Sequence, residues 1–380
     1  MKKSFYYFLF AAATVSFYSC SSNDEPIPDP DPDPVESVDT SSFFILGRGS
    51  SYAGIDGSLS YYDYSSEDYV MVKESLTVFK DSNERSLGLS PNDMALYGGK
   101  LYIITYESAT MEIVDINTMK SVKQYEFGVN PHSGSKSMPR HIEISGGKAY
   151  ITTYDGYLAR YDCATDVVDG FTAYLGPNPE GVAIAGDNIY VAISGGMNSV
   201  QGLPYDERVA IINKSTFDIK GYITVGTNPT DIVTNGTDVF VTCMGDYTPN
   251  GVKPMIWRIY GEKSQGYVPG TLMAIKDRQL YVINAPWDSP DPISYKCYMI
   301  DNSDDNYDFI EKGEGVDYPS ALAVDRMTGN IIIGSATMDG QYPSWSKNGY
   351  YKMFTSDGKK VLRGETGIDP AVAIFVPKSE

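Results

Sequence analysis

The side chains that most often do acid–base or metal chemistry are scarce in this sequence. Among 380 residues there are only two histidines, His132 and His141. A metal site built from several histidines is therefore excluded, and a catalytic relay that needs histidine has at most two candidates. Cys163, Cys243 and Cys297 lack the spacing of a zinc site, and three thiols cannot form a complete set of disulfides, so we predict buried structural thiols.

Charged and polar side chains recur in one kind of place, one or two residues after a proline. The set is Asp93, Arg140, His141, Glu180, Asp231 and Ser320. Donors and acceptors of this kind could hydrogen-bond the amide or hydroxyl groups of a ligand. They could equally well do no more than solvate the entrance of a channel, and both interpretations stay open.

Aromatic side chains with a polar tip recur in irregular polar segments and at strand ends. The candidates for ligand contact are Tyr106, Tyr154, Tyr205, Tyr247, Trp287, Tyr342 and Trp345. The third tryptophan, Trp257, belongs to a predicted strand. Exposed aromatic side chains are common binding anchors, so we predict a binding role for the set rather than random decoration of loops.

Motifs for covalent or phosphate chemistry are missing from the sequence. There is no Gly-x-Ser-x-Gly elbow, no phosphate-binding loop and no dinucleotide fingerprint. The segment 301–306 is similar to a calcium loop, but it has no central glycine and Lys312 stands where the last carboxylate would be. We predict a solvated turn there, no metal site and no catalytic residues.

The elements that position these residues follow a repeat. Seven prolines open short apolar runs at intervals of 40 to 51 residues: Pro91, Pro139, Pro179, Pro229, Pro269, Pro319 and Pro370. Most of these runs are followed by a turn with Gly, Asn or Asp, and then by a second strand rich in β-branched and aromatic residues. The interval is that of a four-stranded propeller blade.

The sequence therefore predicts an all-β, seven-bladed β-propeller of four-stranded antiparallel blades. Three strands of the seventh blade come from residues 43–72 and the fourth from 372–376, so pairing of the N- and C-terminal strands closes the ring. No stretch of the chain predicts an amphipathic helix.

The lengths of the loops indicate which end of this ring binds a ligand. The first-to-second and third-to-fourth turns of the blades are short, whereas the second-to-third loops and the blade crossings vary in length. The long segments are 81–90, 129–138, 195–206, 244–254, 285–295 and 336–348. We predict that a ligand binds at this end.

The N-terminus resembles the signal of a bacterial lipoprotein. Lys2 and Lys3 precede a short apolar stretch, and the segment 17–20 resembles a lipoprotein cleavage box that ends in Cys20. Residues 1–19 are expected to be the signal peptide, and residues 20–41 the lipidated Cys20, an acidic patch and a linker rich in Pro and Asp. Residues 42–380 form the propeller, which is anchored to the membrane by lipid only.

The formal net charge of −19 disfavours binding to nucleic acid. It does not oppose a largely neutral ligand.

The blades resemble YVTN-type propellers, through runs such as Pro179–Ala183, the Tyr-Val pair at 190–191 and the strands that end in Asp115, Asp162 and Asp301. The acidic patch after Cys20 resembles the surface-export signal of Bacteroidota lipoproteins. Together these features resemble the cobalamin-capture lipoproteins of the BtuG type. That resemblance implies an outer-membrane protein that faces the cell exterior, binds cobalamin or another corrinoid on the long loops, and passes it to a TonB-dependent transporter. Cobalamin would be a ligand, and no cofactor is expected.

Two other functions stay open. Aromatic loops also suit a glycan-binding or protein-docking propeller of a polysaccharide utilisation system. Asp93, Glu180 and Asp231 could imitate the metal-binding cluster of propeller lactonases, although we favour a binding protein over an enzyme.

Overall fold

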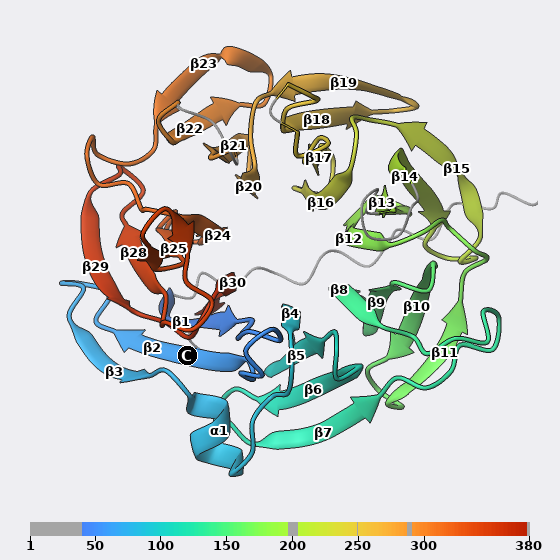
Figure 1. Ribbon diagram of the computed structural model, residues 1–380, viewed down its shortest axis with the longest axis horizontal. Coiled ribbons are helices and arrows are strands. Elements are labelled where there is room, and N and C mark those ends of the chain that lie inside the picture. The colour runs from blue at the N-terminus through green and yellow to red at the C-terminus, as the bar shows by residue number, and fades with distance from the viewer. Residues whose placement is uncertain (1–39, 197–203, 249, 287–290, 378–380) are drawn as a thin grey trace, which may run out of the picture. The chain divides into compact units, whose positions relative to one another are not determined.

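The computed structural model describes residues 40–196, 204–248, 250–286 and 291–377. These residues form seven four-stranded antiparallel sheets arranged as the blades of a β-propeller (Figure 1). The predicted fold is confirmed. The predicted signal peptide, Cys20 and nearly all of the linker lie outside the described residues. Within the described part of the chain, no helix has the length and hydropathy needed to cross a membrane.

Blades 1 to 4 follow one another along the chain. Blade 1 contains β4 (Pro91–Tyr97), β5 (Lys100–Thr105), β6 (Thr110–Asp115) and β7 (Ser121–Glu126). Blade 2 contains β8 (Pro139–Ser145), β9 (Lys148–Thr153), β10 (Tyr157–Asp162) and β11 (Val167–Phe171). Blade 3 contains β12 (Pro179–Ala185), β13 (Asn188–Gly195), β14 (Tyr205–Asn213) and β15 (Ile219–Thr224). Blade 4 contains β16 (Pro229–Thr234), β17 (Val239–Cys243), β18 (Met255–Tyr260) and β19 (Lys263–Val268).

The remaining blades complete the ring. Blade 5 contains β20 (Leu272–Lys276), β21 (Gln279–Asn284), β22 (Ser294–Met299) and β23 (Asn302–Asp308). Blade 6 contains β24 (Pro319–Val324), β25 (Ile331–Ser335), β28 (Tyr350–Phe354) and β29 (Lys360–Glu365), with the small hairpin of β26 (Met338–Asp339) and β27 (Tyr342–Pro343) inserted after β25. Blade 7 contains β30 (Pro370–Pro377), β1 (Thr40–Gly47), β2 (Ser58–Tyr64) and β3 (Met71–Ser75).

Blade 7 closes the ring as predicted. The C-terminal strand β30 pairs antiparallel with β1, which places Phe43 opposite Phe375 and Ile45 opposite Ala373. The innermost strands β4, β8, β12, β16, β20, β24 and β30 surround the axis of the ring, and β30 contacts β4 at the closure (Figure 1). Six of them begin at the recurring proline, and only β20 begins later, at Leu272.

The two ends of the ring differ as the loop lengths predict. At one end, tight hairpins such as Gly98-Gly99, both with positive φ, join the first and second strands. At the other end, the second-to-third loops bond directly to the blade crossings. The Tyr106 N–H donates to the Ser90 carbonyl (2.9 Å), and the Tyr154 N–H donates to the Met138 carbonyl (2.9 Å). We call this second end the long-loop face.

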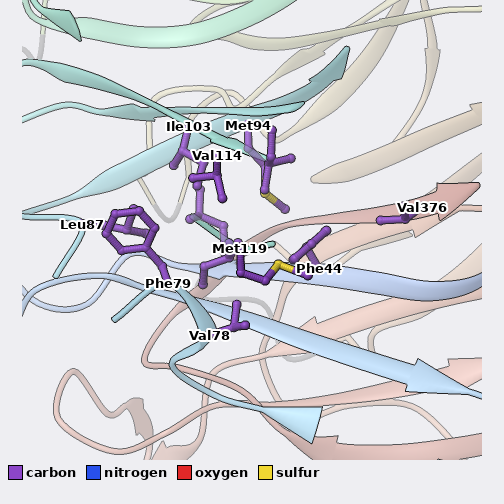
Figure 2. Close-up of a cluster of buried hydrophobic side chains, with 12 residues drawn as sticks. Phe44, Val78, Phe79, Leu87, Met94, Ile103, Val114, Met119 and Val376 are labelled. Atoms are coloured by element: carbon purple, nitrogen blue, oxygen red, sulfur yellow. The ribbon is translucent and has the colours of Figure 1, made fainter. Parts of the chain in front are cut away.

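Two predictions about local structure were wrong. Residues Val78–Asn83 form the helix α1, whose Val78 and Phe79 are buried against blades 7 and 1 (Figure 2). A helix of six residues is too short to show a helical period in the sequence. Its two apolar residues fill the space between the neighbouring blades. The segment 301–306 is not only a turn, because β23 begins at Asn302.

The three described cysteines are free thiols. Cys243 and Cys297 are buried, and burial raises the pKa of Cys243 to about 12 and that of Cys297 to about 11. Cys243 and Cys297 therefore stay protonated at neutral pH and pack as small apolar groups, as predicted, whereas Cys163 is only partly buried.

Candidate functional site on the long-loop face

Arg140 is the centre of a charge network at the inner edge of the long-loop face. Its Nε and Nη2 donate to Glu180 Oε2 (3.1 and 2.9 Å), and its Nη1 donates to Asn92 Oδ1 (2.9 Å). The rings of Tyr106 and Tyr154 lie 5.1 and 4.5 Å from the guanidinium carbon. The two rings are in contact with each other, edge to face. Arg140 is therefore fixed by two blades besides its own.

His141 joins the same network from the neighbouring position on β8. Its Nδ1 lies 3.1 Å from Asp93 Oδ2, and its Nε2 lies 3.6 Å from Glu180 Oε2. Burial alone would lower the pKa of His141, but hydrogen bonds to Asp93 and Glu180 outweigh it and raise the pKa to about 9. The imidazole is therefore protonated at neutral pH.

Glu180 is the common acceptor of the network and is nearly inaccessible to solvent (6% exposed). Besides Arg140 and His141, it accepts hydrogen bonds from the Tyr154 hydroxyl and from Ser194 Oγ (3.4 Å). Burial would raise its pKa, but Arg140 and His141 outweigh burial and hold the pKa at about 2. The carboxylate is ionised and saturated with donors.

The geometry gives this network a positioning role. The charged atoms of Asp93, Arg140, His141 and Glu180 bond one another across blades 1, 2 and 3. Their predicted direct contact with a ligand stays a prediction. The network fixes Tyr106 and Tyr154 on the long-loop face. It brings these two tyrosines together with four residues of the predicted charged set, Asp93, Arg140, His141 and Glu180, and adds Asn92, which was not predicted.

Asp231 lies beside the network on β16. The Ile232 N–H donates to its Oδ1 (2.9 Å), and its other carboxylate oxygen has no partner within the described part of the chain. Gly181 allows this approach of strands, because a Cβ there would lie 2.8 Å from Asp231 Cα. Burial raises the pKa of Asp231. Ser320, on β24, has a buried hydroxyl without a partner among the described residues.

Tyr205 and Tyr247 form a second aromatic pair, with ring centroids 6.2 Å apart. Tyr247 is half-exposed (47%). Burial raises the pKa of Tyr247 to about 12, with contributions from the nearby groups Tyr205, Glu180 and Tyr318.

A pocket of about 480 Å³ opens at the junction of blades 6, 7 and 1. Its lining residues are Arg48, Gly49, Ser50, Ser51, Tyr52, Ser90, Trp345 and Asp369. Trp345 is 47% exposed and Tyr52 is 97% exposed, so two exposed aromatic side chains line the pocket. Arg48 Nη1 donates to Asp369 Oδ2 (3.1 Å). The volume lies within the range of small-molecule sites.

The predicted aromatic residues that the structure describes occur in separate contacts. Trp345 lines the pocket, Tyr106 and Tyr154 flank Arg140, and Tyr205 and Tyr247 pair. Tyr342 lies in the hairpin strand β27 and is 66% exposed. Trp287 lies outside the described residues.

Sequence reasoning missed the pocket residues Arg48, Tyr52 and Asp369. A signal was present for the first two, because the segment 48–57 joins the second and third strands of the split blade 7. It is therefore equivalent to the long loops of the other blades. Asp369 only precedes a recurring proline, and no pattern separates it from the other residues in that position.

Within the described part of the chain, no three His, Cys, Asp or Glu side chains are placed to hold a metal ion. The network has two cations and at least two anions close together, with most of their hydrogen-bonding capacity already used. The pocket, in contrast, offers open aromatic surface and open donors.

Comparison with known proteins shows the fold and no family. No protein-family profile matches the chain, and no curated protein matches it. Among solved structures, it is similar to Kuenenia stuttgartiensis hydrazine synthase (TM-score 0.56, 12% identity, 76% of this chain and 96% of that chain). It is also similar to a functionally unknown protein from Desulfotomaculum acetoxidans (TM-score 0.53, 13% identity, 90% and 100%) and to U3-55K (TM-score 0.53, 10% identity, 74% and 83%).

Proposed function

We propose that this protein is a lipid-anchored binding protein of the outer membrane that captures a corrinoid at the pocket of blades 6, 7 and 1. It faces the cell exterior and passes its ligand to a TonB-dependent transporter. The observation that carries the proposal is the pocket itself, in which Trp345 and Tyr52 stand beside the Arg48–Asp369 ion pair.

The ion pair favours a neutral ligand. One Arg48 nitrogen bonds Asp369, and the guanidinium's other donors have no partner within the described part of the chain. The charge of Arg48 is therefore compensated while its N–H groups stay available, which suits a carbonyl acceptor better than a second anion. The net charge of −19 acts in the same direction. A corrinoid offers a flat ring for the aromatic side chains and a rim of neutral amides for Arg48.

Replacing Trp345 by alanine is expected to weaken the binding of cyanocobalamin by about 1–3 kcal/mol, or roughly 5- to 150-fold in Kd. Its side chain is half-exposed, so the free energy of unfolding should change by less than about 0.5 kcal/mol. Isothermal titration calorimetry measures the first quantity and urea denaturation the second. Tyr260→Ala, which removes a similarly exposed aromatic from β18, is the matched control.

The titration also decides between the open alternatives. The absence of heat with micromolar cyanocobalamin would remove the corrinoid and leave the glycan or protein-docking function ahead. A large loss of stability in Trp345→Ala would instead make the tryptophan a packing residue.

Replacing Cys20 by alanine is expected to release the protein from the outer membrane, because the single acylation site would be lost. Fractionation of cells into membrane and soluble protein, followed by immunodetection, measures this effect. Cys163→Ala removes a thiol of the propeller and should leave the protein in the membrane fraction. Equal membrane recovery of the Cys20 variant and the native protein would contradict lipid anchoring.

A further inference from the structure

Tyr174 is an exposed side chain whose ring packs against the backbone of a glycine. It lies on the crossing between β11 and β12, and 54% of its surface is open to solvent. The ring lies directly against Gly156, which has φ +105°, and a Cβ at Gly156 would come within 2.1 Å of Tyr174 Cε2. The Leu175 N–H also donates to the Gly156 carbonyl (2.8 Å). Only glycine permits this contact.

An aromatic row supports the ring from one side. Tyr157, which is 8% exposed, meets Tyr174 edge to face with ring centroids 5.7 Å apart. His132 stacks on Tyr157 at 6.0 Å. Tyr174 is the exposed end of this row, so its orientation is fixed before any ligand arrives, which lowers the entropic cost of binding.

A charge-balanced polar pair also lies near Tyr174. Arg208 Nε and Nη2 donate to the Asp206 carboxylate (2.8 and 2.6 Å). The guanidinium carbon lies 4.9 Å from the ring of Tyr222, which is 41% exposed. Arg208, Asp206 and Tyr222 are all near enough to Tyr174 to perturb its pKa, which burial raises first of all. We call these residues, with Tyr157, the Tyr174 patch.

Gly176 allows Arg208 to lie close to the crossing that carries Tyr174. A Cβ at this glycine would lie 3.2 Å from Arg208 Nη2, so the guanidinium lies close above the backbone of the same crossing that carries Tyr174. The patch therefore combines two half-exposed tyrosine rings with one neutralised ion pair. Packing alone does not account for it, because more than half of the Tyr174 surface stays open.

We propose that the Tyr174 patch is a second binding site, for a neutral oligosaccharide. Sugar rings present C–H faces that pack on exposed aromatic rings, and hydroxyl groups that can bond the edge of a paired Arg and Asp. Because Asp206 compensates Arg208 and the whole chain is strongly negative, the patch disfavours acidic sugars. The patch belongs to blades 2 and 3, whereas the pocket belongs to blades 6, 7 and 1. The inference goes beyond the proposed corrinoid function and does not depend on it.

The test is affinity electrophoresis of the full-length chain in native gels that contain laminarin, mannan, pullulan or inulin, with alginate as the acidic comparison. We expect retardation in at least one neutral polysaccharide and none in alginate. Tyr174→Ala and Tyr222→Ala should each reduce the retardation at least fivefold, and Gly156→Ala should reduce it by displacing the ring. Tyr260→Ala and Trp345→Ala should leave it unchanged.

Several outcomes would overturn the proposal. They are unchanged migration in all four neutral gels, retardation in alginate equal to that in a neutral gel, and undiminished retardation of both Tyr174→Ala and Tyr222→Ala. Thermal melting of each variant identifies a folding defect. Because Tyr222 lies on the exposed outer strand β15, its variant keeps the test decisive if Tyr174→Ala is unstable.

Discussion

Replacement of Glu180 by alanine is expected to lower the free energy of unfolding by about 3–5 kcal/mol, the range measured when one partner of a buried ion pair is removed. Glu180 is 6% exposed and is the shared acceptor of Arg140 and His141. Without it, two positive charges would stay close together, with Asp93 paired with His141 and Asp231 nearby to balance them. Arg140 is held by Asn92 and two tyrosine rings and cannot move easily to solvent.

Urea denaturation followed by tryptophan fluorescence measures this loss. Glu180→Gln keeps the shape and an acceptor oxygen, so it should lose less than the alanine variant. Asp301→Ala is the matched control, because it removes one carboxylate from an exposed ion pair with Arg278 and should change the midpoint little. A loss below about 1 kcal/mol in Glu180→Ala would show that the network does not hold the blades together.

The ring and its two ends could be predicted from the sequence because both depend on local chemistry that recurs. A proline begins six of the seven inner strands, and Gly98-Gly99 supplies the positive φ that a tight hairpin needs. These features act over two to five residues and recur around the ring, although β20 begins after its proline and no hairpin joins β30 to β1. By contrast, α1 occurs once and is shorter than two turns, so no repeat and no period indicated it.

The ion pairs of the charge network could be predicted from the sequence, but the contact of Tyr154 with Glu180 could not. Asn92, Arg140 and Glu180 each directly follow a recurring proline, and equivalent positions of successive blades lie side by side in a propeller. Opposite charges at equivalent positions therefore indicate an ion pair between neighbours. The sequence does not show that Tyr154 turns inward to bond Glu180, because this depends on how the loop leaves β9.

The pocket and the Tyr174 patch show that loop length alone does not identify the residues of a binding site. Tyr174 lies in a crossing of ordinary length, 172–178, whereas Tyr52 lies in the segment 48–57, which is as long as the segments 81–90 and 129–138. Neither tyrosine was among the predicted site residues. What distinguishes them is what they contact, an ion pair at the pocket and the backbone of Gly156. Contacts of this kind join residues from different blades, and a single sequence carries no direct signal for them.

Stability is expected to fall as pH rises from 6.5 to 9, through the loss of a proton from His141. The pKa of His141 is raised to about 9 in the fold, against about 6.5 in the unfolded chain. The stabilisation is therefore fully present below pH 6.5 and is lost as pH rises through 9. At 1.36 kcal/mol per pKa unit, the loss is roughly 3 kcal/mol.

Glu143 changes stability in the same direction over a lower pH range. Burial on β8 raises its pKa to about 7; the charge of Arg326 opposes this shift and that of Asp93 adds to it. A carboxyl with a raised pKa stabilises the fold in its protonated form, so this contribution is lost between pH 4.5 and 7. The two residues together predict a continuous decline in stability from about pH 5 to pH 9.

Urea titrations at half-unit intervals from pH 4.5 to 9 separate the two contributions. Glu143→Gln should flatten the profile below pH 7 and stabilise the protein at pH 8, because no half-buried carboxylate then has to ionise at this position. His141→Gln should lower stability at pH 6 and flatten the profile above pH 7, because the titrating imidazolium that interacts with Asp93 and Glu180 is then missing. Substitution of the exposed His132 is the control and should leave the decline above pH 7 in place. A His141→Gln profile that still falls by 3 kcal/mol between pH 7 and 9 would assign the alkaline loss to other groups and remove the protonated imidazole from the network.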